Sequence, residues 1–68
     1  MIVNNQELTT TLERIRRLQA QLAQLRIVET NPASYRPSAS GFLAEVDRMQ
    51  LEVREYLSLH PTDLRPPA

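Results

Sequence analysis

The strongest constraint on the fold is a row of apolar residues that recurs every three or four positions in the second half of the sequence. The row follows the a and d positions of a heptad repeat without a slip: Ala39, Phe42, Val46, Met49, Val53, Tyr56 and then His60. This spacing is that of an α-helix with one apolar face. Leu43 and Leu57 at the adjacent e positions widen that face, which favours a helical bundle over a two-stranded coiled coil. We therefore predict a helix over about residues 39–59, ending before Pro61.

A second apolar row lies in the first half of the sequence. Its members are Leu8, Leu12, Ile15, Leu18, Leu22 and Leu25. Their mean spacing is slightly below the ~3.6 residues of a helical turn, which favours a gentle left-handed wrap against a neighbouring helix. Asn4 stands three residues before Glu7, which is the spacing of a capping box at a helix start. Because no Gly or Pro lies between residues 5 and 31, we predict a helix over about residues 5–29.

Two prolines separate the two rows. Pro32 and Pro37 each disfavour helical geometry in the residue before them, so we predict a loop over about residues 30–38, with Ser38 or Ser40 capping the second helix. A loop of this length lets the helices fold back on each other in antiparallel fashion. The predicted fold is therefore all-α, an antiparallel two-helix hairpin over residues 1–61. Residues 62–68 are predicted to form a flexible C-terminal tail.

The chain has 68 residues, which is too short for two helices to bury all their apolar side chains. Small folds of this kind rely on disulfides, a metal or oligomerisation. The sequence has no cysteine, and its single histidine, His60, cannot form a metal site alone, so we expect neither metal nor cofactor. We predict instead that two hairpins pair into a four-helix bundle, a dimer. The residues predicted to form its core and oligomer interface are Leu8, Leu12, Ile15, Leu18, Leu22, Leu25, Phe42, Val46, Met49, Val53, Tyr56 and Leu57.

Charge is balanced over the whole chain, with eight basic and eight acidic residues, so we expect no polyanion or anionic membrane partner. The two helices differ. Residues 5–28 hold four arginines and two acids, a net charge of +2, whereas residues 40–59 hold four acids and two arginines, a net charge of −2. Complementary charge of this kind tunes pairing without driving it, since exposed pairs contribute only ~0.2–1 kcal/mol each.

The sequence predicts no membrane span and no secretion signal. No stretch approaches the ~18 apolar residues of a spanning helix, and Asn4 and Asn5 follow directly on Met1, Ile2 and Val3, so no signal-peptide apolar segment is present. The cytoplasm is therefore the expected compartment.

Few side chains suggest catalysis. Glu52 and Glu55 share a helical face, but Arg48 lies between Glu45 and Glu52 at spacings of three and four, which indicates a solvated ion-pair ladder. His60 lies near a helix C-terminus, where it suits a capping role. We therefore expect no enzymatic activity and no catalytic residues.

Two further clusters have both a functional and a structural interpretation. Arg14, Arg16 and Arg17 form the main basic cluster, but nucleic-acid binding would require a longer basic stripe, so we do not expect it. Tyr35-Arg36-Pro37 could be a recognition tip or a plug over the open end of the hairpin, and we favour the plug. Leu51, at an f position, is expected to remain exposed or to mark a further contact.

Residues 38–57 combine a heptad with a Glu-Tyr-Leu motif, and together with the opening Met1-Ile2-Val3-Asn4-Asn5 they resemble short bacterial helical-hairpin proteins. Segments of that type also precede helix-turn-helix domains in antitoxin-like regulators. The resemblance extends to about Pro61 and implies an oligomerising or partner-binding module. It does not carry over the regulators' DNA-binding function. The expected function is thus a structural protein-interaction module that self-associates; the alternative is an antitoxin-like or regulatory subunit that folds on binding a partner protein.

Overall fold

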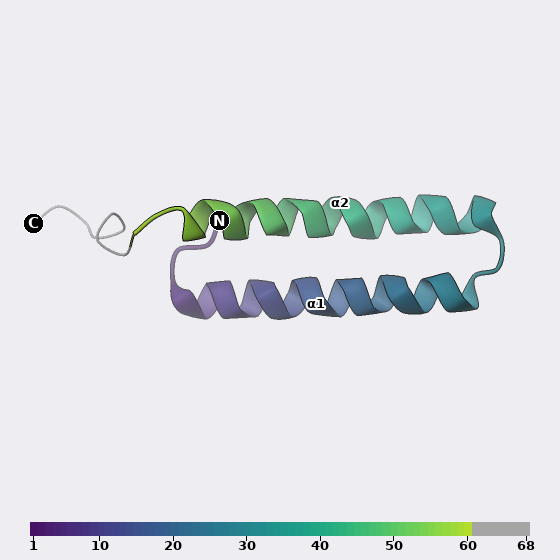
Figure 1. Cartoon of the computed structure of the whole chain (residues 1–68), viewed down its shortest axis with the longest axis horizontal. Coiled ribbons are helices and arrows are strands. Elements are labelled where there is room, and N and C mark those ends of the chain that lie inside the picture. Colours follow the sequence, from purple (N-terminus) through teal and green to yellow (C-terminus); the bar gives the residue numbers. More distant parts are fainter. Residues whose placement is uncertain (61–68) are drawn as a thin grey trace, which may run out of the picture.

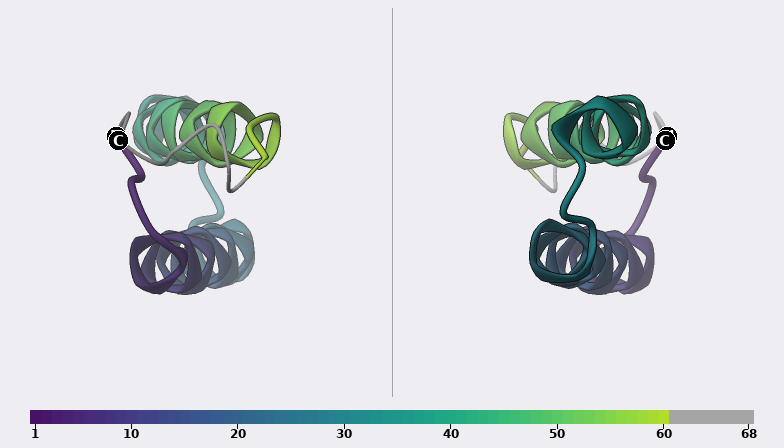
Figure 2. Two further views of the ribbon diagram at one scale, coloured as in Figure 1. Left: turned by 90° about the vertical axis from the view of Figure 1, so that its left-hand side faces the viewer. Right: turned by 90° about the vertical axis from the view of Figure 1, so that its right-hand side faces the viewer.

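The computed structural model describes residues 1–60 and shows two antiparallel helices lying side by side (Figure 1). Helix α1 spans Asn5–Val28 and helix α2 spans Pro32–Leu57. The end-on views show the two helices as a single layer, with a short connection at one end and the N-terminal segment at the other (Figure 2). The predicted all-α hairpin is confirmed. The predicted tail over residues 62–68 lies outside the described residues.

Helix α1 begins with the capping interactions that its sequence predicts. Asn4 has extended backbone geometry, and its Oδ1 accepts a hydrogen bond from the Glu7 amide at 2.8 Å. Glu7 in turn reaches back, where its Oε2 accepts from the Val3 amide at 2.8 Å. In a standard capping box this carboxylate would accept from the amide of the cap residue, here Asn4. Because it accepts from Val3 instead, Glu7 also holds the segment before the helix in place. At the other end, the Glu29 amide donates to the Leu25 carbonyl at 2.9 Å.

The predicted loop over residues 30–38 is wrong, because α2 begins at Pro32. Asn31 caps this helix, with its Oδ1 accepting from the Ala33 amide at 3.0 Å. Proline suits the first position of a helix, since its fixed φ is already helical and its missing N–H would have no partner there. The connection between the helices is thus reduced to residues 29–31. Ser38 and Ser40, predicted as caps, lie inside α2.

Pro37 also lies inside α2. A proline at this point removes one helical hydrogen bond, to the carbonyl of Ala33, and its ring crowds that carbonyl. The helix nevertheless continues, and the side chains on either side of Pro37 pack inward: Ala39 is buried and Tyr35 is half-buried. This packing, together with the Asn31 cap, offsets the local cost of the proline.

The core between the helices is small. Ile15 from α1 meets Val46 and Met49 from α2, and these side chains are 7%, 4% and 2% exposed. Leu18 and Val53 pack against this cluster while partly exposed. Each helix contacts only one partner along its length, so most of its apolar stripe stays within reach of water.

Candidate functional site

Of the side chains predicted to form a core and interface, the hairpin itself buries Ile15, Val46 and Met49. A larger group is half-buried: Leu8, Leu18, Leu22, Leu25, Phe42, Val53 and Tyr56. Leu12 and Leu57 are 47% and 63% exposed, so they do not belong to the core of the single hairpin. Nothing within residues 1–60 covers them.

Two buried residues were missing from that prediction. Ala39 is 5% exposed, and its a position in the heptad could have identified it. Ile2 is also 5% exposed, although it precedes α1 and follows no helical period. Its burial depends on the N-terminal segment folding back across the hairpin, which no local pattern indicates.

The hairpin has two broad faces, one on each side of the core between the helices. The residues that flank the core on each helix show which side chains belong to which face. In α1, Leu12 and Leu18 lie about 60° to either side of Ile15, and in α2, Leu43 and Met49 lie about 60° to either side of Val46. Leu18 lines a hollow with Phe42 and Glu45, so these side chains share one face. Leu43 lines a different hollow, with Arg36 and Asp47 among its neighbours. Leu12 and Leu43 therefore lie on the opposite face from Leu18.

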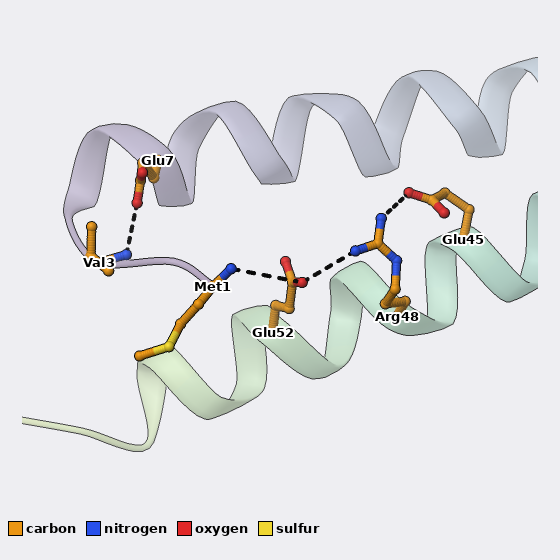
Figure 3. Close-up of polar contacts among 6 residues, drawn as sticks. All are labelled: Met1, Val3, Glu7, Glu45, Arg48 and Glu52. Carbon is orange, nitrogen blue, oxygen red and sulfur yellow. Dashed lines mark hydrogen bonds and ion pairs between the residues drawn. The ribbon is translucent and has the colours of Figure 1, made fainter.

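The first of these faces is crossed by residues 1–4, which run from the start of α1 to the end of α2 (Figures 2 and 3). We call it the strap face. Ile2 is buried there, in a hollow that Tyr56 and Leu59 help to line. The amino group of Met1 lies 4.0 Å from Glu52 Oε1. Glu7 on α1 and Glu52 on α2 line a common hollow with Met1, which places them on the same face. The chain thus covers part of this face by itself.

Charged side chains of α2 continue along the strap face. Arg48 donates through Nη2 to Glu45 Oε1, and its Nη1 lies 3.4 Å from Glu52 Oε1 (Figure 3). The hydrogen bond that Arg48 donates to Glu45 and the charge of Glu45, with a smaller contribution from the charge of Glu52, raise the pKa of Arg48. The predicted ion-pair ladder is confirmed. These carboxylates are engaged with Arg48, which suits a solvated structural role rather than acid–base work.

The second face, which we call the open face, carries residues seven positions apart on each helix: Leu12 and Gln19 on α1, and Leu43, Gln50 and Leu57 on α2. Every one of these side chains is exposed. The three leucines keep 47%, 48% and 63% of their surface exposed. Because residues 1–4 cross the other face, nothing in the described part of the chain covers this row.

The opposite net charges of the two helices do not produce ion pairs between α1 and α2. Arg14, Arg16 and Arg17 are exposed, and within residues 1–60 none of them pairs with a carboxylate. A polar contact across the helices is instead neutral: Tyr56 Oη donates to Asn5 Oδ1 at 2.9 Å. The early start of α2 also adds Arg36, so this helix holds four acids and three arginines, a net charge of −1.

The remaining candidate residues lie apart from one another. Tyr35 is half-buried in the first turn of α2 and lines a hollow with Arg26 and Glu29, a position closer to a plug than to a projecting tip. His60 is exposed and lies beyond Ser58, the C-cap of α2. Leu51 is 54% exposed.

Within residues 1–60, no three or more His, Cys, Asp or Glu side chains gather in a way that could hold a metal ion. Neither helix of that part of the chain is long and apolar enough to cross a membrane. No protein family, no curated protein and no solved structure matches this chain. By its geometry, the part of the chain that the structure describes is an all-α helical hairpin with one open apolar face.

Proposed function

We propose that this chain is a non-catalytic protein-interaction module that completes its core by pairing with a second copy into a four-helix bundle. The observation that carries the proposal is the shallow core. Of the apolar side chains that form the two helical stripes, the hairpin buries only Ile15, Ala39, Val46 and Met49. In a four-helix bundle each helix packs against more than one neighbour, so the apolar side chains on the docking face lose their remaining contact with water.

The hydrophobic effect supplies the driving force in this proposal. Burial of apolar surface contributes roughly 25 cal/mol per Å², and a single exposed leucine is ordinary on any protein. A row of leucines along one face of the hairpin is different, because a second hairpin docking on that face covers the whole row at once. Leu12, Leu43 and Leu57 form such a row.

Sedimentation equilibrium over a wide concentration range, with helicity followed by circular dichroism, tests the proposal. We expect a species of twice the chain mass that loses helix as it dissociates on dilution. A chain that stays monomeric and fully helical at all concentrations would contradict the proposal, because its hairpin would then be stable without a partner.

A third result would support the alternative function, that of an antitoxin-like or regulatory subunit. In that case the isolated chain is monomeric with little helix, because the missing half of its core belongs to another protein. Helix would then form only when that protein is added.

A further inference from the structure

We propose that the second copy docks on the open face in one orientation: α1 against α1 and α2 against α2, with the helix connections of the two hairpins at opposite ends of the bundle. The inference rests on the proposed function and adds to it the surface and the geometry of pairing. Its partner is a second copy of this chain.

The strap face is a poor surface for such docking. Residues 1–4 cross it, Ile2 is already buried there, and the Glu45–Arg48–Glu52 ladder would have to lose water. Removing charged groups from water is costly unless every one of them is fully paired. The open face has no such obstacle, and it carries Leu12, Leu43 and Leu57.

The register within one hairpin sets which residues lie at the same height. Asn5 lies beside Tyr56, through a hydrogen bond of 2.9 Å, and Ile15 packs with Val46. Each helix rises about 1.5 Å per residue, so each further step along α1 is matched by a step back along α2. By this match Leu12 is level with Met49, and its nearest neighbour in the open-face row of α2 is the next residue, Gln50.

A two-fold axis perpendicular to the helices, passing beside Gln50 and Leu12, matches every leucine of the row. Leu43 precedes Gln50 by seven residues and Leu57 follows it by seven, so each meets the other on the second copy. Leu12 lies on the axis and meets the second copy's Leu12. Such an interface is isologous, since the same patch serves both chains, and the dimer is closed.

A two-fold axis parallel to the helices gives a worse match. It would stack α1 on α2 of the second copy and place the helix connections at the same end. By the same register, Leu12 would then meet Gln50, and Leu43 would meet Gln19. In this orientation each glutamine amide faces a leucine and lacks a hydrogen-bond partner, which is unfavourable in an apolar interface. In the first orientation Gln50 faces the second copy's Gln50, and the two amides can bond to each other.

Charges at the rim of the open face agree with the first orientation. Asp47 lies three residues before Gln50 and Arg54 lies four residues after it. Both are exposed and neither forms an ion pair within residues 1–60. The axis beside Gln50 brings Asp47 of each copy close to Arg54 of the other copy. Two equivalent ion pairs can therefore form between the copies.

Cysteine cross-linking tests this geometry, since the natural chain has no cysteine. Leu12→Cys should form a covalent dimer by itself on mild oxidation. Leu43→Cys and Leu57→Cys should cross-link when the two variants are mixed, and poorly when each is alone. Val28→Cys is the matched control, because this valine is 62% exposed but lies sixteen residues along α1 from Leu12, so the two copies of Val28 are far apart in the proposed dimer. We expect Leu12→Cys to react on the order of a hundredfold faster than Val28→Cys, because thiols held within a complex meet at an effective concentration near the millimolar range.

The outcomes separate the orientation from the proposed function. One result would be a dimer by centrifugation in which Leu12→Cys does not cross-link but a mixture of Leu12→Cys and Gln50→Cys chains does. This result would overturn the orientation and leave the proposed function standing. Equal rates for Val28→Cys and Leu12→Cys would overturn the proposed interface. A monomer at all concentrations would overturn the proposed function and the inference with it.

Discussion

The two faces of the hairpin are built by the same two helices and yet differ in what covers them. On the strap face, residues 1–4 fold across the groove, Ile2 is 5% exposed and Arg48 binds both Glu45 and Glu52. On the open face, Leu12 and Leu43 keep nearly half of their surface in water. The difference indicates that a two-helix fold with a surplus of apolar side chains can cover one side with its own N-terminal segment. The other side stays exposed within residues 1–60, and we propose that a second copy covers it.

The core that both faces share should be the most sensitive part of the molecule. Val46→Asp places a charge without a partner at a position that is 4% exposed. We expect a loss of about 3–5 kcal/mol in the free energy of unfolding, measured by urea denaturation with circular dichroism, because an uncompensated buried charge is costly. Leu51→Asp, on the outside of the same helix, should change stability little. Equal stability of the two variants would mean that the core is assigned wrongly.

A charge on the open face should separate association from folding of the strap face. Leu12→Asp removes an apolar contact from each copy and sets two carboxylates against each other across the axis. We expect the dimerisation free energy to weaken by about 3 kcal/mol, measured by sedimentation equilibrium, since a fully buried leucine contributes ~1.5–3 kcal/mol. If Leu12→Asp left the dimer unchanged while a charge on the strap face dissociated it, the roles of the two faces would be reversed.

Truncation of the strap should act on folding and leave the docking surface itself unchanged. Ile2→Ala removes a buried side chain, and we expect the free energy of unfolding to fall by about 2 kcal/mol, near the low end for isoleucine truncations because the segment can readjust. Because the chain is expected to lose helix as it dissociates, the dimer should also dissociate more readily on dilution, but Leu12→Cys should still cross-link in the Ile2→Ala background, since the open face is intact. Val3→Ala is the control, because Val3 is 57% exposed. An identical effect of both variants would show that residues 1–4 do not pack as a strap.

The smallest effect is expected from the rim charges of the open face. Asp47→Arg and Arg54→Asp should each weaken the dimer by about 0.2–1 kcal/mol, and the double variant should recover most of that loss. The recovery should decrease at high salt, because exposed pairs are screened. Additive losses in the double variant would argue against contact between these two positions across the axis.

Much of the fold follows from local sequence, and so does the centre of the core. The helical period of each apolar row places Ile15, Val46 and Met49 inward whatever the helix packs against. Asn4 and Glu7 begin α1 as predicted, because capping depends on atoms within a few residues. The ion pairs of Arg48 are equally local, at spacings of three and four within one helix.

The start of α2 could not be predicted in this way. The local sequence around Pro32 is compatible both with the end of one helix and with the start of the next. Proline disfavours helical geometry in the residue before it, whereas its own fixed φ suits the first position of a helix. Pro37 would by local rules exclude helix around it, and the chain tolerates it because Tyr35 and Ala39 pack toward α1. That packing requires α1 to be present.

The sequence by itself thus determined the two helices, the cap of α1 and the stripe that faces inward, because each depends on contacts within about one or two helical turns. Only the tertiary structure decided that Ile2 is buried, that α2 begins at Pro32, and which side of each stripe lies under residues 1–4. The physical reason is that the path of the short connection and of the N-terminal segment depends on contacts between residues about fifty positions apart, such as Asn5 and Tyr56. Leu12 and Leu43 became the open face because the chain crosses on the other side.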